Sequence, residues 1–590
     1  MTCRCLLVAL LLLLPRPGSV AGLAVASEEI VTTAPVAEDG VLYAASYEVP
    51  EMNGHLRAFA LHGSRRECLW DAAELVPPPG SAVPPPVAPG MAALAPGFHD
   101  DSGERLIVTN LPAAQDVGLL TFDVRAAHLL QPLLGVATVA EAGSLINAVR
   151  GRLETSAALP GGTGDRPARL GAISRSSPAL VGGSAFDSAA FRDQVLYAGA
   201  EDGLLHAILA GRWSSADTGY DPLAAGCGRE LWAYLPGSLL PALATAGFDG
   251  APRLTSVHVD GAPAVDDLFY DSDGDGRCEW HTVLVGTASV QPANHGVVFA
   301  LDVTDPYAPR LLWERNLGVV GLGPSRGVAI GRAGTGVNGA VQVYVTAAQA
   351  TGSAAGRPGV IACALDLVDG TLRWRFVAPY PEAVDDPGVP PTAPVLMEAT
   401  GSGGIDGILF GDLAGRLWAL APENGAPMND GPIWLTPGGA AEPLGGGLAL
   451  SNRLVLFGTG GVESAPEDGR YAVYAVEILP AGARLLWTHP LERGEKLWGA
   501  PTLDRFGRAY FGVGDVGAET GRLVAVAADG TFGGAVSLAG VPCGGPRVTT
   551  GAVVTISRGG TIEQVGELRQ EGRDLDGNPL RVRVFSWRMR

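Results

Sequence analysis

One short pattern recurs along most of the chain and limits the folds that the chain can adopt. It consists of a glycine, two or three strand-forming residues, a small residue and further apolar residues. The seven copies begin at Gly54, Gly203, Gly296, Gly359, Gly415, Gly469 and Gly521. Self-similarity at an interval is typical of repeat proteins, and alternation with period two is typical of strands with two different faces. The pattern therefore predicts an all-β repeat protein.

A tryptophan often follows a copy of the pattern, at the end of the next expected strand. These tryptophans are Trp70, Trp232, Trp313, Trp374 and Trp487. The small residue allows strands to approach closely, and a tryptophan between two repeats buries a large apolar area. A spacing of roughly fifty to ninety residues is too long for a β-solenoid and suits the blades of a β-propeller with inserted loops.

We therefore expect a modified β-propeller over residues 27–565, followed by a C-terminal tail over residues 566–590. Seven copies predict seven blades, and a weaker copy at Gly118 would make eight. Glycine accounts for 83 of the 590 residues, about twice its usual share, which suits short strands joined by tight turns. Little helix is expected beyond short turns in the loops.

The first residues have the features of an export signal. Arg4 supplies a positive charge, Leu6 to Leu14 form an unbroken apolar run, and small residues suited to cleavage follow up to Ala26. The apolar run is only about half of the ~20 residues that a membrane-spanning helix needs. We expect a signal peptide over residues 1–26 and no integral membrane span.

Charge and cysteine content argue against a nucleic-acid-binding protein and against a cysteine zinc site. The net charge of −20 disfavours nucleic-acid binding, because contacts with phosphates need clustered lysine and arginine. Five cysteines follow the signal, an odd number that leaves at least one thiol free or paired with another chain, and the pairing stays open. No two cysteines have the Cys-x-x-Cys spacing of a zinc site.

The motif that most clearly indicates a binding site is Asp271-Ser-Asp-Gly-Asp-Gly-Arg-Cys-Glu-Trp280. Carboxylates at its first, third and fifth positions converge if the loop curls around one point, and glycine at the sixth position allows the sharp turn. The predicted ligands of a calcium ion are Asp271, Asp273, Asp275, the backbone carbonyl of Arg277, and Glu279. Thr282 stands where an EF-hand has its bidentate glutamate, and no helices are expected beside the loop. A plain acidic β-turn is the alternative.

The sequence offers no catalytic residue and no cofactor-binding residue. The nine histidines are scattered along the chain. His206 lies inside a strand repeat, where we expect a structural role, and Asp266 and Asp267 are expected to cap a strand beside the calcium loop. We therefore expect that the protein is not an enzyme.

Several strings, taken in order, resemble the propeller domain of the PilC/PilY family. They include Leu170-Gly-Ala-Ile-Ser-Arg-Ser-Ser-Pro178, Gly228-Arg-Glu-Leu-Trp-Ala-Tyr-Leu-Pro236 and the closing Phe585-Ser-Trp-Arg588. The resemblance covers most of the chain from about Gly40 onward. It implies a seven-bladed propeller in which calcium loops lie between strands. It also implies a place at the bacterial surface or the type IV pilus tip, or in the periplasm and outer membrane.

The same resemblance implies the partners and the role of the protein. The partners would be the minor pilins or the pilus tip, together with a host or abiotic surface. The role would be adhesion, pilus assembly against retraction, and twitching motility. Many members of the family carry a large N-terminal region, often similar to a von Willebrand A domain. No Asp-x-Ser-x-Ser motif of such a domain occurs here, so the roles of that region are not carried over.

A second resemblance supports a rival hypothesis. The segment Ala364-Leu-Asp-Leu-Val-Asp-Gly-Thr-Leu-Arg-Trp374 resembles the blade repeat of quinoprotein dehydrogenases, which also combine propellers with calcium. Those enzymes generally have eight blades, and many carry two adjacent cysteines in the cofactor site, a pair that is absent here. The same repeat occurs in noncatalytic scaffold propellers, including outer-membrane assembly factors. A quinoprotein-like periplasmic oxidoreductase and a noncatalytic assembly scaffold are therefore the alternatives.

Overall fold

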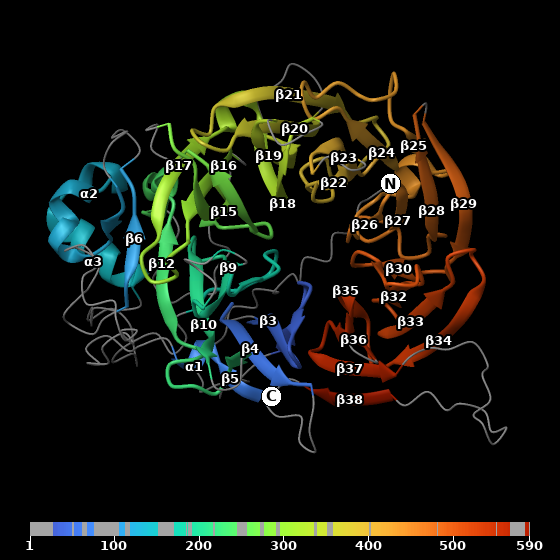
Figure 1. Ribbon diagram of the computed structural model, residues 1–590, viewed down its shortest axis with the longest axis horizontal. Helices are drawn as coiled ribbons and strands as arrows, with labels where there is room; N and C mark the ends of the chain where they lie inside the picture. Colours follow the sequence, from blue (N-terminus) through green and yellow to red (C-terminus); the bar gives the residue numbers. More distant parts are fainter. Residues whose placement is uncertain are drawn as a thin grey trace, which may run out of the picture.

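Eight β-sheets stand side by side around a ring, in the order in which they occur along the chain (Figure 1). This count refers to the residues that the computed structural model describes. They are residues 28–588 without 50–51, 62–67, 76–104, 112–117, 151–169, 185, 187–190, 216–218, 245–256, 272–275, 291–294, 335–338, 351–357, 400–402, 481, 550–551 and 567–583. The expected β-propeller is confirmed. The eight sheets agree with eight blades, not with the seven that the repeat count favoured.

The first three blades contain the strands that follow. Blade 1 holds β1 (Glu28–Ile30), β2 (Val36–Glu38), β3 (Val41–Val49), β4 (Gly54–Ala60) and β5 (Cys68–Asp71). Blade 2 holds β6 (Ile107–Thr109), β7 (Leu120–Thr121), β8 (Ala179–Val181), β9 (Gln194–Gly199), β10 (Leu205–Ser214), β11 (Gly219–Asp221) and β12 (Glu230–Leu235). Blade 3 holds β13 (Val257–His258), β14 (Ala264–Tyr270), β15 (Glu279–Val290), β16 (His295–Asp302) and β17 (Arg310–Asn316).

The other five blades are more regular, and four of them are plain four-stranded sheets. Blade 4 holds β18 (Leu322–Arg332), β19 (Val341–Gln349), β20 (Gly359–Asp366) and β21 (Leu372–Pro379). Blade 5 holds β22 (Val395–Glu398), β23 (Ile405–Gly411), β24 (Arg416–Leu420) and β25 (Trp434–Leu435). Blade 6 holds β26 (Leu448–Ser451), β27 (Leu454–Gly458), β28 (Ala472–Leu479) and β29 (Gly482–Pro490). Blade 7 holds β30 (Lys496–Leu497), β31 (Thr502–Leu503), β32 (Ala509–Asp515), β33 (Thr520–Val526) and β34 (Phe532–Leu538). Blade 8 holds β35 (Pro542–Thr549), β36 (Ala552–Ser557), β37 (Thr561–Gly566) and β38 (Val584–Arg588).

The seven glycine repeats lie at or just before the third strand of blades 1 to 7, namely β4, β10, β16, β20, β24, β28 and β33. The third strand of blade 8 is β37, which follows Gly560. This copy was missed because Gln564 stands four residues after the glycine, where five of the seven other copies have alanine. The weak copy at Gly118 does not start a blade, since it leads into β7 at the edge of blade 2. Strand β38 extends the propeller into the segment that the sequence assigned to a tail.

A tryptophan on the outer, fourth strand of a blade stands opposite the small residue of the repeat. Trp374 on β21 is paired in register with Ala364 on β20, and a β-bulge follows this pair. The same pairing with a bulge occurs at Trp70, Trp232, Trp313 and Trp487. The indole nitrogen of Trp374 donates a hydrogen bond to Pro422 O of the next blade at 2.8 Å. The predicted position of tryptophan between blades is therefore confirmed.

The ring closes without exchange of strands between the two ends of the chain. Each blade is made from one continuous stretch of sequence, so blade 1 meets blade 8 through loops and side chains. Val31 N donates to Arg558 O at 2.9 Å, and Arg547 Nε donates to Pro35 O at 2.7 Å. Val31 and Phe59 also pack in one apolar cluster with residues of blade 8 such as Ile556.

An inserted unit between blades 1 and 2 departs from the expected lack of helix. It contains α2 (Ala127–Leu134) and α3 (Val139–Val149), drawn at the left of Figure 1, whereas α1 (Ala72–Leu75) and α4 (Leu240–Leu243) are single turns. Helix α3 begins with a capping box that sequence reasoning overlooked. Thr138 Oγ1 accepts from Glu141 N at 3.1 Å, and Glu141 Oε2 accepts from Ala137 N at 2.9 Å.

The helices of the described part do not include a single one that is long and apolar enough to cross a membrane. The segments Val124–Leu134 and Val139–Val149, bent by 105° with respect to each other, meet the length and composition criteria only as a pair. The predicted signal peptide, residues 1–26, lies outside the described residues.

All five cysteines that follow the predicted signal are described, and none of them forms a disulfide with another. Cys68 and Cys278 are exposed, whereas Cys227, Cys363 and Cys543 are buried. The sequence left the pairing of the cysteines open, and in the structure all five are free thiols.

We expect Gly425→Ala to destabilise the propeller more than Gly439→Ala, although both glycines flank β25 at positive φ, +69° and +55°. A Cβ at position 425 would lie 2.3 Å from Trp374 Cε3, whereas one at position 439 would meet no atom closer than 3.9 Å. The positive φ costs an alanine about 1–2 kcal/mol. The clash with the indole adds about 1–3 kcal/mol at position 425 alone. Urea unfolding measures the difference, and equal losses would contradict the docking role of Trp374.

Candidate functional site

The predicted calcium loop connects the first and second long strands of blade 3. Strands β14 and β15 pair in an antiparallel hairpin whose last pair before the loop is Tyr270 with Glu279. Residues 271–278 form the connection between them. Aspartate and glycine are typical of such turns, because they adopt the backbone conformations that a tight reversal needs. The expectation of a loop between strands, with no helix on either side, is confirmed.

One hydrogen bond within the described part of the loop brings two positions of the motif together. Gly276 N donates to Asp271 Oδ2 at 2.9 Å. Gly276 has a φ of +86°, and a Cβ added to it would meet no atom within 4 Å. The glycine is therefore required by the backbone conformation and not by lack of space. This contact places the sixth residue of the motif beside the carboxylate of its first.

The predicted ligands are only partly within the described residues. Asp271 is half-buried, whereas Arg277 and Glu279 are exposed. Asp273 and Asp275 lie outside the described residues. Among the residues that are described, no group of three or more His, Cys, Asp or Glu side chains is placed to hold a metal ion.

Charged residues on blade 3 hold the base of the hairpin. Glu279 Oε2 lies 3.9 Å from His281 Nε2, and His281 Nδ1 lies 2.9 Å from Asp302 Oδ2 on β16. The guanidinium of Arg310 on β17 also contacts Asp302 Oδ2. Burial raises the pKa of Asp302, but hydrogen bonds from Thr304 and Arg310 outweigh burial and lower it overall. This carboxylate therefore stays charged and links β15, β16 and β17 below the loop.

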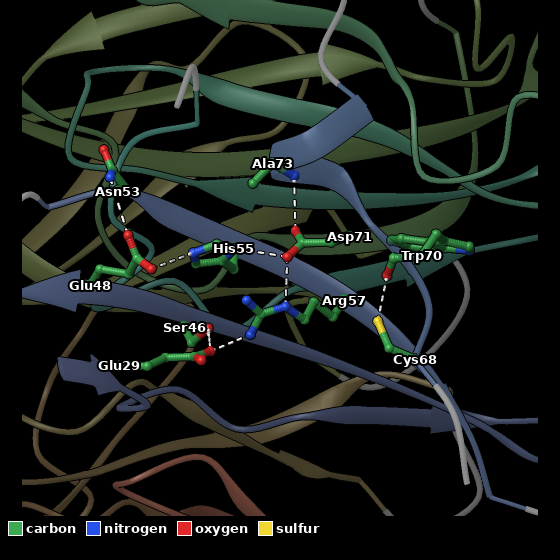
Figure 2. Close-up of polar contacts among 10 residues, drawn as sticks. All are labelled: Glu29, Ser46, Glu48, Asn53, His55, Arg57, Cys68, Trp70, Asp71 and Ala73. Carbon is green, nitrogen blue, oxygen red and sulfur yellow. Dashed lines mark hydrogen bonds and ion pairs between the residues drawn. The ribbon is translucent and has the colours of Figure 1, made fainter. Parts of the chain in front are cut away.

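A second charge network, which sequence reasoning missed, lies on blade 1 (Figure 2). Arg57 on β4 donates from Nε to Asp71 Oδ2 at 2.6 Å and from Nη1 to Glu29 Oε1 of β1. His55 Nδ1 lies 2.8 Å from Asp71 Oδ2. Burial raises the pKa of Asp71, but His55 and Arg57 outweigh it and lower it overall. The network fastens the short strand β1 and the outer strand β5 to the blade.

The sequence contains a weak signal for the blade 1 network. His55 and Arg57 are two residues apart on a strand, so they share one face, and Asp71 stands opposite Arg57 in register. Charged residues on a strand usually face solvent, and the pairing partner on β5 is unknown before the register is known. The contact thus becomes visible only in the folded sheet.

A third network surrounds His206 on β10, which is fully buried. His206 Nδ1 lies 2.7 Å from Glu230 Oε1, and Nε2 lies 3.3 Å from Asp202 Oδ1. Arg105, from the inserted unit, donates from Nε to Glu230 Oε2 at 2.5 Å. Both ring nitrogens face carboxylates of blade 2, and Arg105 bonds to one of these, Glu230, so the network ties the insertion to blade 2. This agrees with the structural role expected for His206.

The charges in this third network shift the pKa values of its members in opposite directions. Burial lowers the pKa of His206, but Asp202 and Glu230 outweigh burial and raise it to about 9. Burial raises the pKa of Glu230, but Arg105 and His206 outweigh it and lower it to about 2. His206 is therefore a cation at neutral pH and is not suited to act as a general base.

Fold and geometry define the chain as a β-propeller protein with a candidate cation loop on one blade. No protein-family model matches the chain. Among curated proteins, it is similar to the type IV pilus biogenesis factor PilY1 of Pseudomonas aeruginosa strain PAO1. The two are 28% identical over 349 residues, which are 55% of this chain and 26% of that protein. A PilY1 homolog of Xylella fastidiosa is 30% identical over 207 residues, 32% of this chain and 15% of the homolog.

These matches confirm the resemblance to the PilC/PilY family, and the chain is PilY1-like in sequence. It spans about a quarter or less of the length of these relatives. Among solved structures, one match to this chain is the quinohemoprotein alcohol dehydrogenase from Comamonas testosteroni. The TM-score is 0.45 at 12% identity, covering 92% of this chain and 71% of that one. BamB from Moraxella catarrhalis has a TM-score of 0.30 at 15% identity, covering 65% and 96%. Such scores carry no functional argument.

We expect the stability of the protein to fall between pH 7 and pH 9.5 as His206 loses its proton. The folded-state pKa of about 9 lies above the ordinary value of 6.5, so the stabilisation is fully present below about pH 6.5 and is lost as pH rises through 9. The loss is about 2–3 kcal/mol. Urea unfolding at the two pH values should show a smaller loss in His206→Gln.

His489→Gln is the control for this experiment. Burial and Arg522 lower the pKa of His489, so it is neutral in the folded protein over the whole range. The variant should lose as much stability as the wild type between pH 7 and pH 9.5. An unchanged loss in His206→Gln would contradict the assignment of the charge to His206.

Proposed function

We propose that this chain is an exported, calcium-binding β-propeller of the type IV pilus system. In this proposal it supports surface adhesion, control of pilus biogenesis and retraction, and twitching motility. The observation that carries the pilus assignment is the similarity to the type IV pilus biogenesis factor PilY1 over 349 residues. The proposal concerns the part of such a factor that this chain represents, because the match covers 26% of that protein.

The proposed partners are the minor pilins or the pilus tip on one side and a host or abiotic surface on the other. The proposed location is the cell surface or pilus tip, or else the periplasm and outer membrane. The features of an export signal in residues 1–26 support this location, and the net charge of −20 argues against a nucleic-acid partner. Free exposed thiols at Cys68 and Cys278 leave room for contacts with another chain.

We also propose that the chain has no catalytic activity of its own. Several titratable groups on blades 1 and 2 are engaged with one another, as at His55 with Asp71 and at His206 with Glu230. Such groups stabilise the fold and are not poised for proton transfer. A quinoprotein-like oxidoreductase remains the rival hypothesis.

The calcium proposal rests on the hairpin of blade 3. The register of β14 and β15 holds the two ends of the motif opposite each other, and the bond from Gly276 to Asp271 places the sixth residue of the motif beside the first. In the proposal, Asp271, Asp273, Asp275 and Glu279 supply carboxylate oxygens, and Arg277 supplies its backbone carbonyl. Clustered carboxylates repel one another until a cation neutralises them. A flexible loop with many oxygens suits calcium better than the smaller magnesium ion.

We expect calcium to bind the full-length protein and to raise its melting temperature. An ion that binds only the folded state stabilises it by about 2.7 kcal/mol at one hundred times its dissociation constant. Isothermal titration with millimolar calcium should give heat for the wild type and none for Asp273→Ala. Asp266→Asn, which removes a charge from β14 outside the motif, should bind calcium as the wild type does. Absence of heat from the wild type would remove the basis for the site.

We expect deletion of this chain's gene in its own bacterium to reduce twitching motility, and the wild-type gene to restore it. If calcium acts as a switch on retraction, Asp273→Ala should disturb twitching or attachment while the protein is still produced. Asp266→Asn should restore both. Normal twitching after deletion would contradict the pilus proposal. Normal twitching with Asp273→Ala, together with loss of calcium binding, would reject the switch and leave a structural calcium site.

A further inference from the structure

Three charged residues from consecutive blades lie at the inner side of the ring. Arg175 precedes β8, Asp260 lies between β13 and β14, and Arg326 lies on β18. Within their sheets, β8, β13 and β18 each lie at one end of the strand order, away from the outer strands β12, β17 and β21. Figure 1 shows β18 at the central edge of blade 4. The three side chains are separate from the calcium loop and from the three charge networks described above.

The backbones that carry Asp260 and Arg326 are in direct contact between blades 3 and 4. Ala262 N donates to Arg326 O at 2.9 Å. A Cβ at Gly261 would lie 2.9 Å from Gly327 N, and Gly261 has a φ of +85°, so glycine is needed there for both space and conformation. The two charged side chains therefore start from neighbouring points of the inner wall. Arg175 reaches the same place, since its Nη1 lies 3.6 Å from Asp260 Oδ2.

Arg326 is a partly buried cation without an acidic partner. Its Nε donates to Pro390 O at 3.2 Å, but no hydrogen bond or ion pair joins either Nη atom to a residue that the structure describes. Burial, followed by the positive charge of Arg175, lowers the pKa of Arg326 to about 10. Because a guanidinium has five N–H donors and only Nε is engaged with a described residue here, Arg326 has donors to spare for a ligand.

Asp260, the ion-pair partner of Arg175, also has an oxygen without a partner among the described residues. Its side chain is 2% exposed, and Oδ2 accepts from Ser289 Oγ at 2.9 Å. Oδ1 is buried and has no hydrogen-bond partner among the described residues. Burial raises the pKa of Asp260 to about 6, and Glu201 contributes to the increase, although Arg175 and Ser289 oppose it. A pKa of about 6 still leaves most of this carboxyl group ionised at neutral pH, so Asp260 is the acidic partner of Arg175.

We propose that Arg175 and Arg326 form a site at the inner wall of the ring for a small oxyanion, a carboxylate or a phosphate group. A guanidinium presents its donors in a planar fork that matches either group with two parallel hydrogen bonds. Ser289 and Arg175 already engage the carboxylate of Asp260, so the Nη atoms of Arg326 have no acidic partner among the described residues. An anion there would relieve the repulsion between the arginines and pair with these Nη atoms. The site depends neither on calcium nor on the pilus proposal.

Isothermal titration of the full-length protein tests this proposal with two probes, malonate and inorganic phosphate, each in a low-salt buffer. We expect at least one probe to bind, and the probe that binds more tightly identifies the group that the site takes. Arg326→Leu should weaken binding by roughly tenfold or more, the effect of losing a charge-assisted hydrogen bond. Asp260→Asn should strengthen binding, because it removes a negative charge that faces the anion.

Two further variants make the result independent of folding defects. Arg175→Gln should also weaken binding, and this side chain is half exposed, so its loss should be tolerated. Arg484→Gln removes an exposed charge from the outer strand β29 and should bind each probe as the wild type does. Absence of heat with both probes would overturn the proposal. Equal affinity in the wild type, Arg175→Gln and Arg326→Leu would also overturn it, because the anion would then bind elsewhere.

Discussion

The contact between the outer-strand indole of one blade and the next blade is the interaction on which the ring depends. Trp70, Trp232, Trp313 and Trp374 each donate a hydrogen bond from the indole nitrogen to a backbone carbonyl of the following blade. The indole satisfies a buried donor and covers apolar surface at the same time. No strand is shared between blades, so such side-chain contacts set the angle between neighbouring sheets. Trp487 keeps the position in blade 6 by packing against Gly530, although its indole nitrogen has no partner among the described residues.

Charged groups hold the parts that depart from a plain four-stranded blade. The short strand β1 is fastened by Glu29 and Arg57, and the inserted helical unit is fastened to blade 2 by Arg105 and Glu230. Glu314 on blade 3 accepts hydrogen bonds from Tyr234 and from the backbone of residues 237 and 238 on blade 2. The inserted helices also dock by apolar burial, since Leu130 and Ile146 belong to the same buried cluster as Trp232 of blade 2. Hydrogen bonds to a charged partner are stronger than neutral ones and add to this attachment.

The two proposed ligand sites differ in how the ring builds them. The calcium site proposed for blade 3 lies between two paired strands, whose register at Tyr270 and Glu279 holds the ends of the loop together. The inner wall between Arg175, Asp260 and Arg326 is a product of the ring, because each residue comes from a different blade. A cation loop and an anion site on one rigid scaffold would allow a pilus-associated propeller to respond to two ions independently.

Local pattern was enough to predict an all-β propeller, the glycine and tryptophan of its repeat, and the acidic loop Asp271–Glu279. Strand alternation, turn residues and a curled loop involve residues that are near one another in the chain. Blade 8 escaped detection because Gln564 on β37 takes the place of the alanine that marks the repeat in five other blades. Arg175, Asp260 and Arg326 are far apart in the sequence, where each resembles an ordinary surface charge. Only the closing of the ring places them together, because the contacts between blades, and not the local sequence, decide which inner strands become neighbours.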